Sequence, residues 1–131
     1  MSITLFCLVH GNTFRNAFSV KIKKNETVYD LKKVIKKNKP NDFANIDADR
    51  LTLWKVDIPF DTPNDKQNTL EADPNVDIST VLEGDELSPM DYIYEYFDKP
   101  TKKHIHIIVE LPVSFGKNLL KYHKQVLTLL S

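Results

Sequence analysis

Apolar and polar residues alternate over two stretches near the start of the chain, which is the pattern of half-buried β-strands. The first stretch places four small or branched apolar side chains on one face, namely Ile3, Leu5, Cys7 and Val9. His10-Gly11-Asn12-Thr13 interrupts it, and Gly-Asn is favourable hairpin-turn chemistry. Alternation resumes from Phe14 to Ile22, with Phe18, Val20 and Ile22 expected to face inward. These residues predict a β-hairpin.

A helical period follows the hairpin. Thr27 with Asp30 three residues later forms an acidic variant of the capping box, which predicts that a helix begins here. Its apolar stripe consists of Val28, Leu31, Val34 and Ile35. We expect four lysines to cover the opposite, solvated side, namely Lys32, Lys33, Lys36 and Lys37. Pro40 and Asn41 are expected to end the helix.

Two more strands and a short helix complete the pattern. Residues 50–56 and 103–111 are predicted strands, and the second has Ile105, Ile107, Val109 and Leu111 on one face. Residues 57–75 contain three prolines among many Asp and Asn residues, which predicts a loop. A short helix is expected from Ser88-Pro89-Met90, with Met90, Ile93, Tyr94 and Phe97 on one face.

This order of elements predicts an α+β fold of the ubiquitin-like β-grasp type. One main helix crosses a mixed sheet, and the first and last strands pair in parallel at the centre because they are the most apolar. We expect one domain over residues 1–112 and a tail over residues 113–131 that contains a C-terminal helix. This tail either docks on the domain, mediates self-association through its apolar stripe, or is the remnant or start of an effector region.

Charge is segregated along the chain although the net charge is zero. Residues 1–40 carry nine basic and two acidic groups, whereas residues 41–100 carry four basic and fifteen acidic groups. Such a dipolar molecule can steer towards a charged partner, although the two regions can also neutralise each other in the folded state. The single cysteine excludes an internal disulfide, and we expect Cys7 to be a buried thiol.

The chain shows no pattern of a catalytic or cofactor-binding site. It has three glycines, no G-x-S-x-G sequence and no EF-hand spacing of carboxylates. His104 and His106 are too few for a zinc site and are expected to point outward from a strand. We therefore expect neither an enzyme nor a cofactor. No apolar run approaches the roughly 20 residues of a membrane span, and residues 1–12 lack the basic start of a signal peptide.

Five segments in order resemble the N-terminal module of the Crinkler effector family. Leu5-Phe6-Cys7 resembles its LFC opening, residues 28–36 its DLKK-type helix, and residues 82–87 its acidic, glycine-containing segment. Leu51-Thr52-Leu53-Trp54-Lys55-Val56 resembles the LxLWKV form of the LxLFLAK motif. His104-Ile105-His106-Ile107-Ile108-Val109-Glu110-Leu111-Pro112 resembles the closing HVLVVVP motif.

The resemblance implies a ubiquitin-like N-terminal module of a secreted effector that is delivered into a host cell and often acts in the host nucleus. In that family the N-terminal module is tied to trafficking, and a variable C-terminal domain carries the activity. Residues 113–131 are too short for such a domain, so we do not carry over nuclease or kinase activities. The expected partners are proteins, either a host target or a second copy, and nucleic acid is not expected. The alternative is an intracellular ubiquitin-like adaptor that is never exported, which the missing signal peptide favours.

Two candidate interaction sites remain open at this point. The four helix lysines form either a basic patch for an acidic partner or an ordinary solvated helix face. Trp54 lies opposite the core stripe of its strand, so it is either a half-exposed interface anchor or is buried under residues 57–88.

Overall fold

The computed structural model describes residues 2–39, 43 and 45–112. Its strands are β1 (Ser2–Val9), β2 (Phe18–Lys23), β3 (Thr52–Pro59), β4 (Asp85–Glu86) and β5 (His104–Glu110). Its helices are α1 (Val28–Asn38) and α2 (Asp65–Ala72), with 3-10 turns η1 (Phe14–Asn16), η2 (Ala48–Arg50) and η3 (Ile93–Glu95). The predicted α+β, ubiquitin-like fold is confirmed, whereas the predicted helix in the tail lies outside the described residues.

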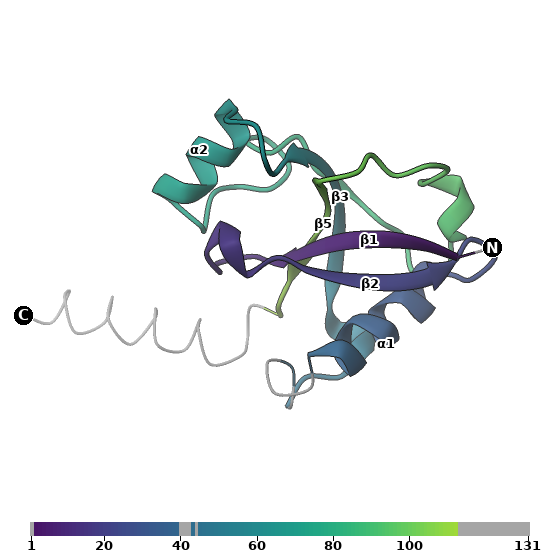
Figure 1. Cartoon of the computed structure of the whole chain (residues 1–131). Coiled ribbons are helices and arrows are strands. Elements are labelled where there is room, and N and C mark those ends of the chain that lie inside the picture. The colour runs from purple at the N-terminus through teal and green to yellow at the C-terminus, as the bar shows by residue number, and fades with distance from the viewer. Residues whose placement is uncertain (1, 40–42, 44, 113–131) are drawn as a thin grey trace, which may run out of the picture.

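The five strands form one mixed sheet in the order β2-β1-β5-β3-β4. β1 and β5 run parallel at its centre, as predicted, and Cys7 lies opposite Ile107 in their register. The other neighbours are antiparallel. α1 lies against one face of the sheet, and α2 lies at the far end of the molecule from the N-terminus (Figure 1).

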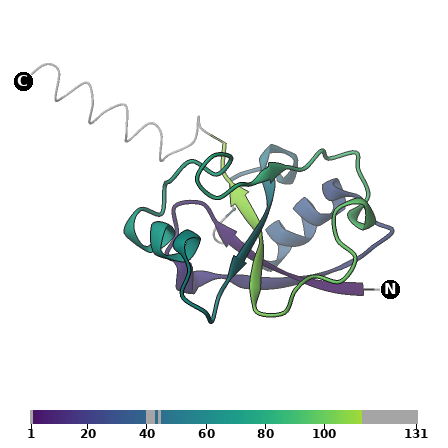
Figure 2. The same ribbon diagram turned by 90° about the horizontal axis from the view of Figure 1, so that it is seen from above.

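The sheet is buried on both faces. The first core lies between the sheet and α1 and includes the fully buried side chains of Leu5, Cys7, Leu31, Ile35, Leu53 and Ile107. The second core lies under α2 and the connections around it, and includes Leu8, Phe14, Ile58, Leu82, Ile105 and Ile108. Because each fully buried Leu or Ile contributes about 1.5–3 kcal/mol, both layers are needed to hold this small domain together. The view from above shows the connections that flank the sheet (Figure 2).

The start of α1 has the predicted capping box. The amide of Asp30 donates to Thr27 Oγ1 at 3.2 Å, and the amide of Thr27 donates to Asp30 Oδ2 at 3.1 Å. Val28, Leu31 and Ile35 are fully buried, which confirms the predicted stripe. The last helical residue is Asn38, and the proposed stop at Pro40 and Asn41 lies outside the described residues.

The hairpin is confirmed, but its connection is longer than predicted. β2 begins at Phe18, opposite Cys7, and not at Phe14. Phe14 belongs to η1 and is buried in the second core, where its ring stacks on that of Phe60 at 4.7 Å. Burial of this ring on the opposite face of the sheet explains why the alternating pattern did not begin a strand at residue 14.

The loop predicted at 57–75 is wrong at its start and in its middle, where the structure has the end of β3 and the helix α2. β3 continues to Pro59, and Asn64 caps α2 by accepting the Gln67 amide at 2.9 Å. Leu70 is the buried apolar residue of α2. Because one buried residue makes no apolar stripe, the sequence pattern does not predict this helix. At the other end of β3, Arg50 belongs to η2 and not to the strand.

The short helix predicted from Ser88 is reduced to η3. Ile93 and Phe97 are buried as expected, but Met90 is 84% exposed and Tyr94 is 57% exposed, so the four residues do not share a face. The prediction that Ile105 shares the face of Ile107 is also wrong, because Ile105 packs in the second core. The register shift in β3 between Lys55 and Ile58 accompanies this change of face.

Candidate interaction site

The segment 51–56 contributes mainly to the interior. Leu51 and Leu53 are buried in the first core and Val56 is buried in the second. These three side chains hold β3 between the two layers, so a partner of the folded protein does not contact them. Trp54 and Lys55 are the members of the segment that reach the surface.

Trp54 is neither a fully exposed interface anchor nor a fully buried core residue. Its half-buried ring packs against the second core, and its indole N–H donates to Glu110 Oε1 at 3.0 Å. This hydrogen bond joins β3 to the end of β5, since Thr52 is the residue that lies opposite Glu110 in the sheet. The arrangement indicates a structural role, with one edge of the ring left to solvent.

Lys55 is held in place by two contacts. Its ammonium group donates to the carbonyl of Tyr96 at 2.7 Å and lies 5.3 Å from the centre of the Phe97 ring. Lys55 therefore anchors the segment that precedes β5 to the sheet, which leaves it a poor candidate for binding an external anion.

Lys32 does not belong to the predicted solvated face. It is only 6% exposed, and burial lowers the pKa of its ammonium group, while the nearby carboxylates of Asp49 and Glu86 raise that pKa. Its position within the apolar stripe between Leu31 and Ile35 explains the error, because the buried face of α1 is wider than the sequence pattern suggested. The remaining candidate patch consists of Lys33, Lys36 and Lys37.

The two histidines of β5 were expected to point outward, and this is wrong for His106. It is 5% exposed, and its ring lies near those of Phe6 and Phe97. Its Nδ1 accepts the amide of Phe6 at 3.0 Å and its Nε2 faces the carbonyl of Thr101 at 2.7 Å. These partners require the neutral tautomer with the proton on Nε2. His104 is half-buried and contacts the carboxylate of Asp57.

Burial is the main cause of a lowered pKa at His106. The neighbouring His104 lowers that pKa further, while the Thr101 carbonyl and the Asp57 carboxylate raise it. A proton on Nδ1 would also remove the acceptor for the Phe6 amide. Protonation of His106 would therefore break this hydrogen bond between β5 and β1. Among the residues that the structure describes, no group of three or more His, Cys, Asp or Glu side chains is placed to hold a metal ion.

Cys7 is a buried thiol, as predicted. It is fully buried in the first core, and burial raises the pKa of its thiol. A thiol with a raised pKa is a poor nucleophile, because the thiolate is the reactive form. Within the described ranges, no helix is long and apolar enough to cross a membrane.

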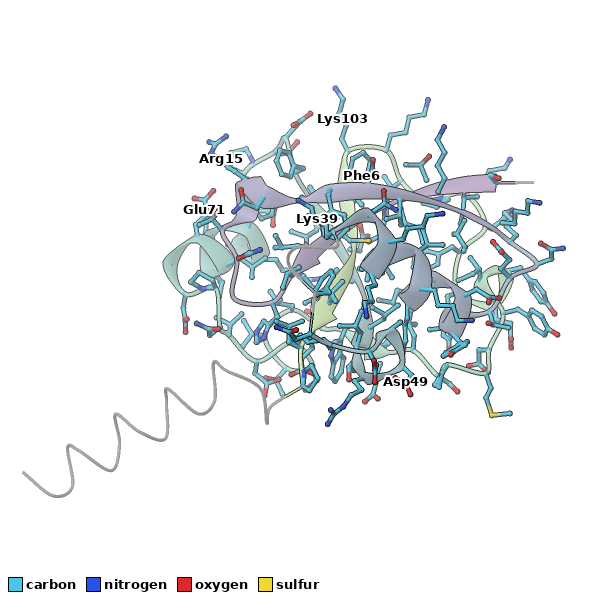
Figure 3. The ribbon with its side chains drawn as sticks, turned by 90° about the horizontal axis from the view of Figure 1, so that it is seen from below. Phe6, Arg15, Lys39, Asp49, Glu71 and Lys103 are labelled. Atoms are coloured by element: carbon cyan, nitrogen blue, oxygen red, sulfur yellow. The ribbon has the colours of Figure 1, made fainter. Side chains whose placement is uncertain are left out.

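The structure brings together four exposed side chains that the sequence did not point to. Tyr29 at the start of α1 lies beside the segment that carries Met90, Tyr92 and Tyr94. Tyr92 and Tyr94 are exposed on either side of the buried Ile93, where the bridge between Tyr92 and Thr27 leads into the 3-10 turn η3. The helix predicted for these residues places Tyr94 with Ile93 on one buried face. The sequence therefore did not predict an exposed surface here. Figure 3 shows the side chains of the molecule seen from below, from the side on which α1 lies.

The fold defines a ubiquitin-like module whose sheet carries an apolar core on each face. A family model described as the Crinkler effector protein N-terminal domain matches residues 3–110. The chain belongs to this family.

Two curated relatives agree with this assignment. Crinkler effector protein 1 of Rhizophagus irregularis is 41% identical over 131 residues, which are 98% of this chain and 26% of that protein. Crinkler effector protein 108 of Phytophthora sojae is 50% identical over 52 residues, which are 40% of this chain and 6% of that protein. The chain thus spans about a quarter of the length of the first relative and less of the second.

Trp54→Ala is expected to lower the free energy of unfolding by about 1–3 kcal/mol, because it removes ring packing and the bond to Glu110. Trp54→Phe keeps most of the packing and should lose only about 1 kcal/mol. Urea denaturation followed by circular dichroism measures both. An alanine variant as stable as the original chain would show that Trp54 is a free surface anchor.

Stability is expected to fall as the pH drops below the ordinary histidine pKa of 6.5, because the pKa of His106 is lower in the folded than in the unfolded chain. The unfolded chain then binds the proton first, and the loss continues until the folded pKa is passed. His106→Gln should flatten this part of the pH profile of the melting temperature, whereas His104→Gln should retain it. A profile unchanged by His106→Gln would contradict the assignment.

Proposed function

We propose that this chain is the non-catalytic N-terminal module of a secreted Crinkler-type effector, which mediates translocation into host cells through protein–protein contacts. The observation that carries the proposal is where the family's recurring segments lie. Leu5, Leu31, Leu53 and Ile107 come from four of these segments and are all fully buried in one core. The segments are therefore parts of one folded unit.

Because segment 51–56 is part of the folded domain, a transport partner cannot bind it as an extended peptide without unfolding part of the sheet. Residues 52–56 lie on β3, between β5 and β4, and Leu51 directly precedes the strand, with both cores packed against this segment. To be read as a linear peptide, it would have to leave the sheet and expose Leu51, Leu53 and Val56. We propose that the surface of the folded module is recognised instead.

The buried ionisable groups support a non-catalytic role. Both ring nitrogens of His106 have structural partners, Cys7 is held as a thiol, and Lys32 lies beside the core. A general base or nucleophile needs access to substrate, and these groups are enclosed. We assign the chain no effector activity of its own, because it corresponds to only about a quarter of Crinkler effector protein 1.

The second candidate is an intracellular ubiquitin-like adaptor that remains in the cell that makes it. The observation in its favour is that the apolar run at residues 3–9 is the central strand β1. Cleavage of this run would remove the middle of the sheet, so the run itself does not serve as a cleaved export signal.

Localisation of a tagged copy of this chain, expressed in its native source, separates the two candidates. We expect the tag inside host cells, including their nuclei, when producer and host are in contact. Retention of the tag in the producing cell would contradict the effector proposal and favour the adaptor.

Two variants make the experiment specific for the folded surface. Leu53→Ala opens a cavity in the first core at a cost of about 2–5 kcal/mol and should reduce delivery with the loss of folded protein. Lys102→Gln changes an exposed position outside the candidate sites and should leave the melting temperature, the amount of folded protein and the delivery unchanged. Delivery of an unfolded Leu53→Ala chain at the original level would show that a linear signal is sufficient.

A further inference from the structure

The exposed large apolar side chains of the described residues are concentrated in one place. Six are exposed, and four of them come from position 29 and from residues 90–94. We call these four residues, Tyr29, Met90, Tyr92 and Tyr94, the tyrosine patch. Solvated apolar surface has a cost, and a contiguous patch of this kind is typical of a binding surface.

The tyrosine patch is held by backbone hydrogen bonds between two distant parts of the chain. The amide of Val28 donates to the carbonyl of Asp91 at 2.9 Å, and that of Tyr29 donates to Pro89 at 3.1 Å. In the other direction, Ile93 donates to Glu26 at 2.8 Å and Tyr94 to Lys24 at 3.0 Å. Residues 89–94 are thus fixed alongside residues 24–29, with Ile93 fully buried beneath them. A surface fixed in this way loses little conformational entropy when it binds a partner.

The tyrosine rings offer flat faces to solvent. The rings of Tyr92 and Tyr94 stack with their centres 5.3 Å apart and their planes 10° apart, so each ring keeps one outer face. The face of an aromatic ring carries negative charge density and attracts cations. Tyr29 already shows this contact, because the ammonium group of Lys33 lies 4.5 Å from the centre of its ring.

The segment that carries Met90, Tyr92 and Tyr94 is acidic, whereas the residues that face it include Lys24 and, beside the Tyr29 ring, Lys33. Residues 88–98 contain three carboxylates, Asp91, Glu95 and Asp98, and no lysine or arginine. Asp98 is paired with Lys24 at 2.6 Å. Asp91 and Glu95 take part in none of the salt bridges found among the described residues. Asp91 accepts the Tyr96 hydroxyl, and Glu95 accepts the Tyr92 amide at 2.7 Å. Each carboxylate has a second oxygen with which to bind a cation.

We propose that the tyrosine patch binds a protein segment that carries arginine side chains. A guanidinium group is planar and weakly hydrated, so it can stack on an outer tyrosine face while its N–H groups donate to Asp91 or Glu95. Met90 adds a flexible apolar contact for the neighbouring residues of the partner. The same carboxylates repel phosphate groups, and this disfavours a nucleic acid as the occupant.

This inference names a partner chemistry for the protein contacts proposed above and in that sense rests on them. Its test is a binding measurement on the purified chain, so it is decided separately from localisation. Binding with retention in the producing cell would refute delivery alone, and delivery without binding would refute the tyrosine patch alone.

The test uses a hexaarginine peptide as the probe and nuclear magnetic resonance of the labelled chain as the readout. We expect saturable shifts of the Tyr92 and Tyr94 ring signals. The double variant Tyr92→Ala with Tyr94→Ala should weaken binding about tenfold or more, whereas the corresponding double phenylalanine variant keeps the ring faces and should stay within about threefold. Glu95→Gln should also weaken binding. Backbone spectra check that each variant is folded.

Three controls decide whether the tyrosine patch is the site. Val81→Ala changes an exposed apolar residue outside the patch and should bind as the original chain does. A hexaglutamate peptide should not bind. No binding of hexaarginine, equal binding by the double alanine variant, or shifts of the same ring signals on addition of a single-stranded RNA without the peptide would each overturn the proposal.

Discussion

Parallel pairing of β1 with β5 is the constraint on which the rest of the structure depends. It joins residues 7–9 to residues 107–109, so the two ends of the domain meet in the middle of the sheet. Leu8 and Ile108 pack on one face of this pair and Cys7 and Ile107 on the other. Parallel strands that are buried on both faces need cover from both sides, which α1 provides on one face and α2 with its neighbouring connections on the other. Every recurring segment of the family therefore depends on the presence of the others.

The division between interior and surface follows from this arrangement. The apolar residues of the family's segments fill the two cores, and segments between them form the surfaces on which partners can act. Trp54 and Lys55 reach the surface but are tied to Glu110 and Tyr96, so even these positions serve the fold. The tyrosine patch, in contrast, is made of side chains whose removal leaves the cores filled. In this chain, the segments that resemble the family's motifs therefore mainly build the fold.

Sequence reasoning succeeded where a local pattern and the tertiary structure agree. The capping box at Thr27, the stripe of α1 and the central pairing of the most apolar strands could all be predicted, since each follows from short-range spacing or simple burial. It failed where a residue's environment is set by distant segments. Lys32 is buried on the wider inner face of α1, where the carboxylates of Asp49 and Glu86 act on its ammonium group, and His106 lies near the rings of Phe6 and Phe97. α2 was missed because a helix with one buried residue carries no stripe. The tyrosine patch was missed because hydrogen bonds to residues 24–29 hold residues 89–94 in a turn, a bridge and the start of η3 in place of the predicted helix.

Native-state hydrogen exchange tests most directly whether the domain is one unit closed by β1 and β5. If it is, the amides of residues 7–9 and 107–109 that are bonded within the sheet exchange only by global unfolding. Their exchange free energy then equals the unfolding free energy measured with denaturant, and the slowest amides of α1 and β3 share it. Exchange of the β5 amides at a clearly lower free energy than those of β1 and β2 would contradict this account. It would show that the N-terminal hairpin and helix form a stable core of their own, to which the closing segment is only added.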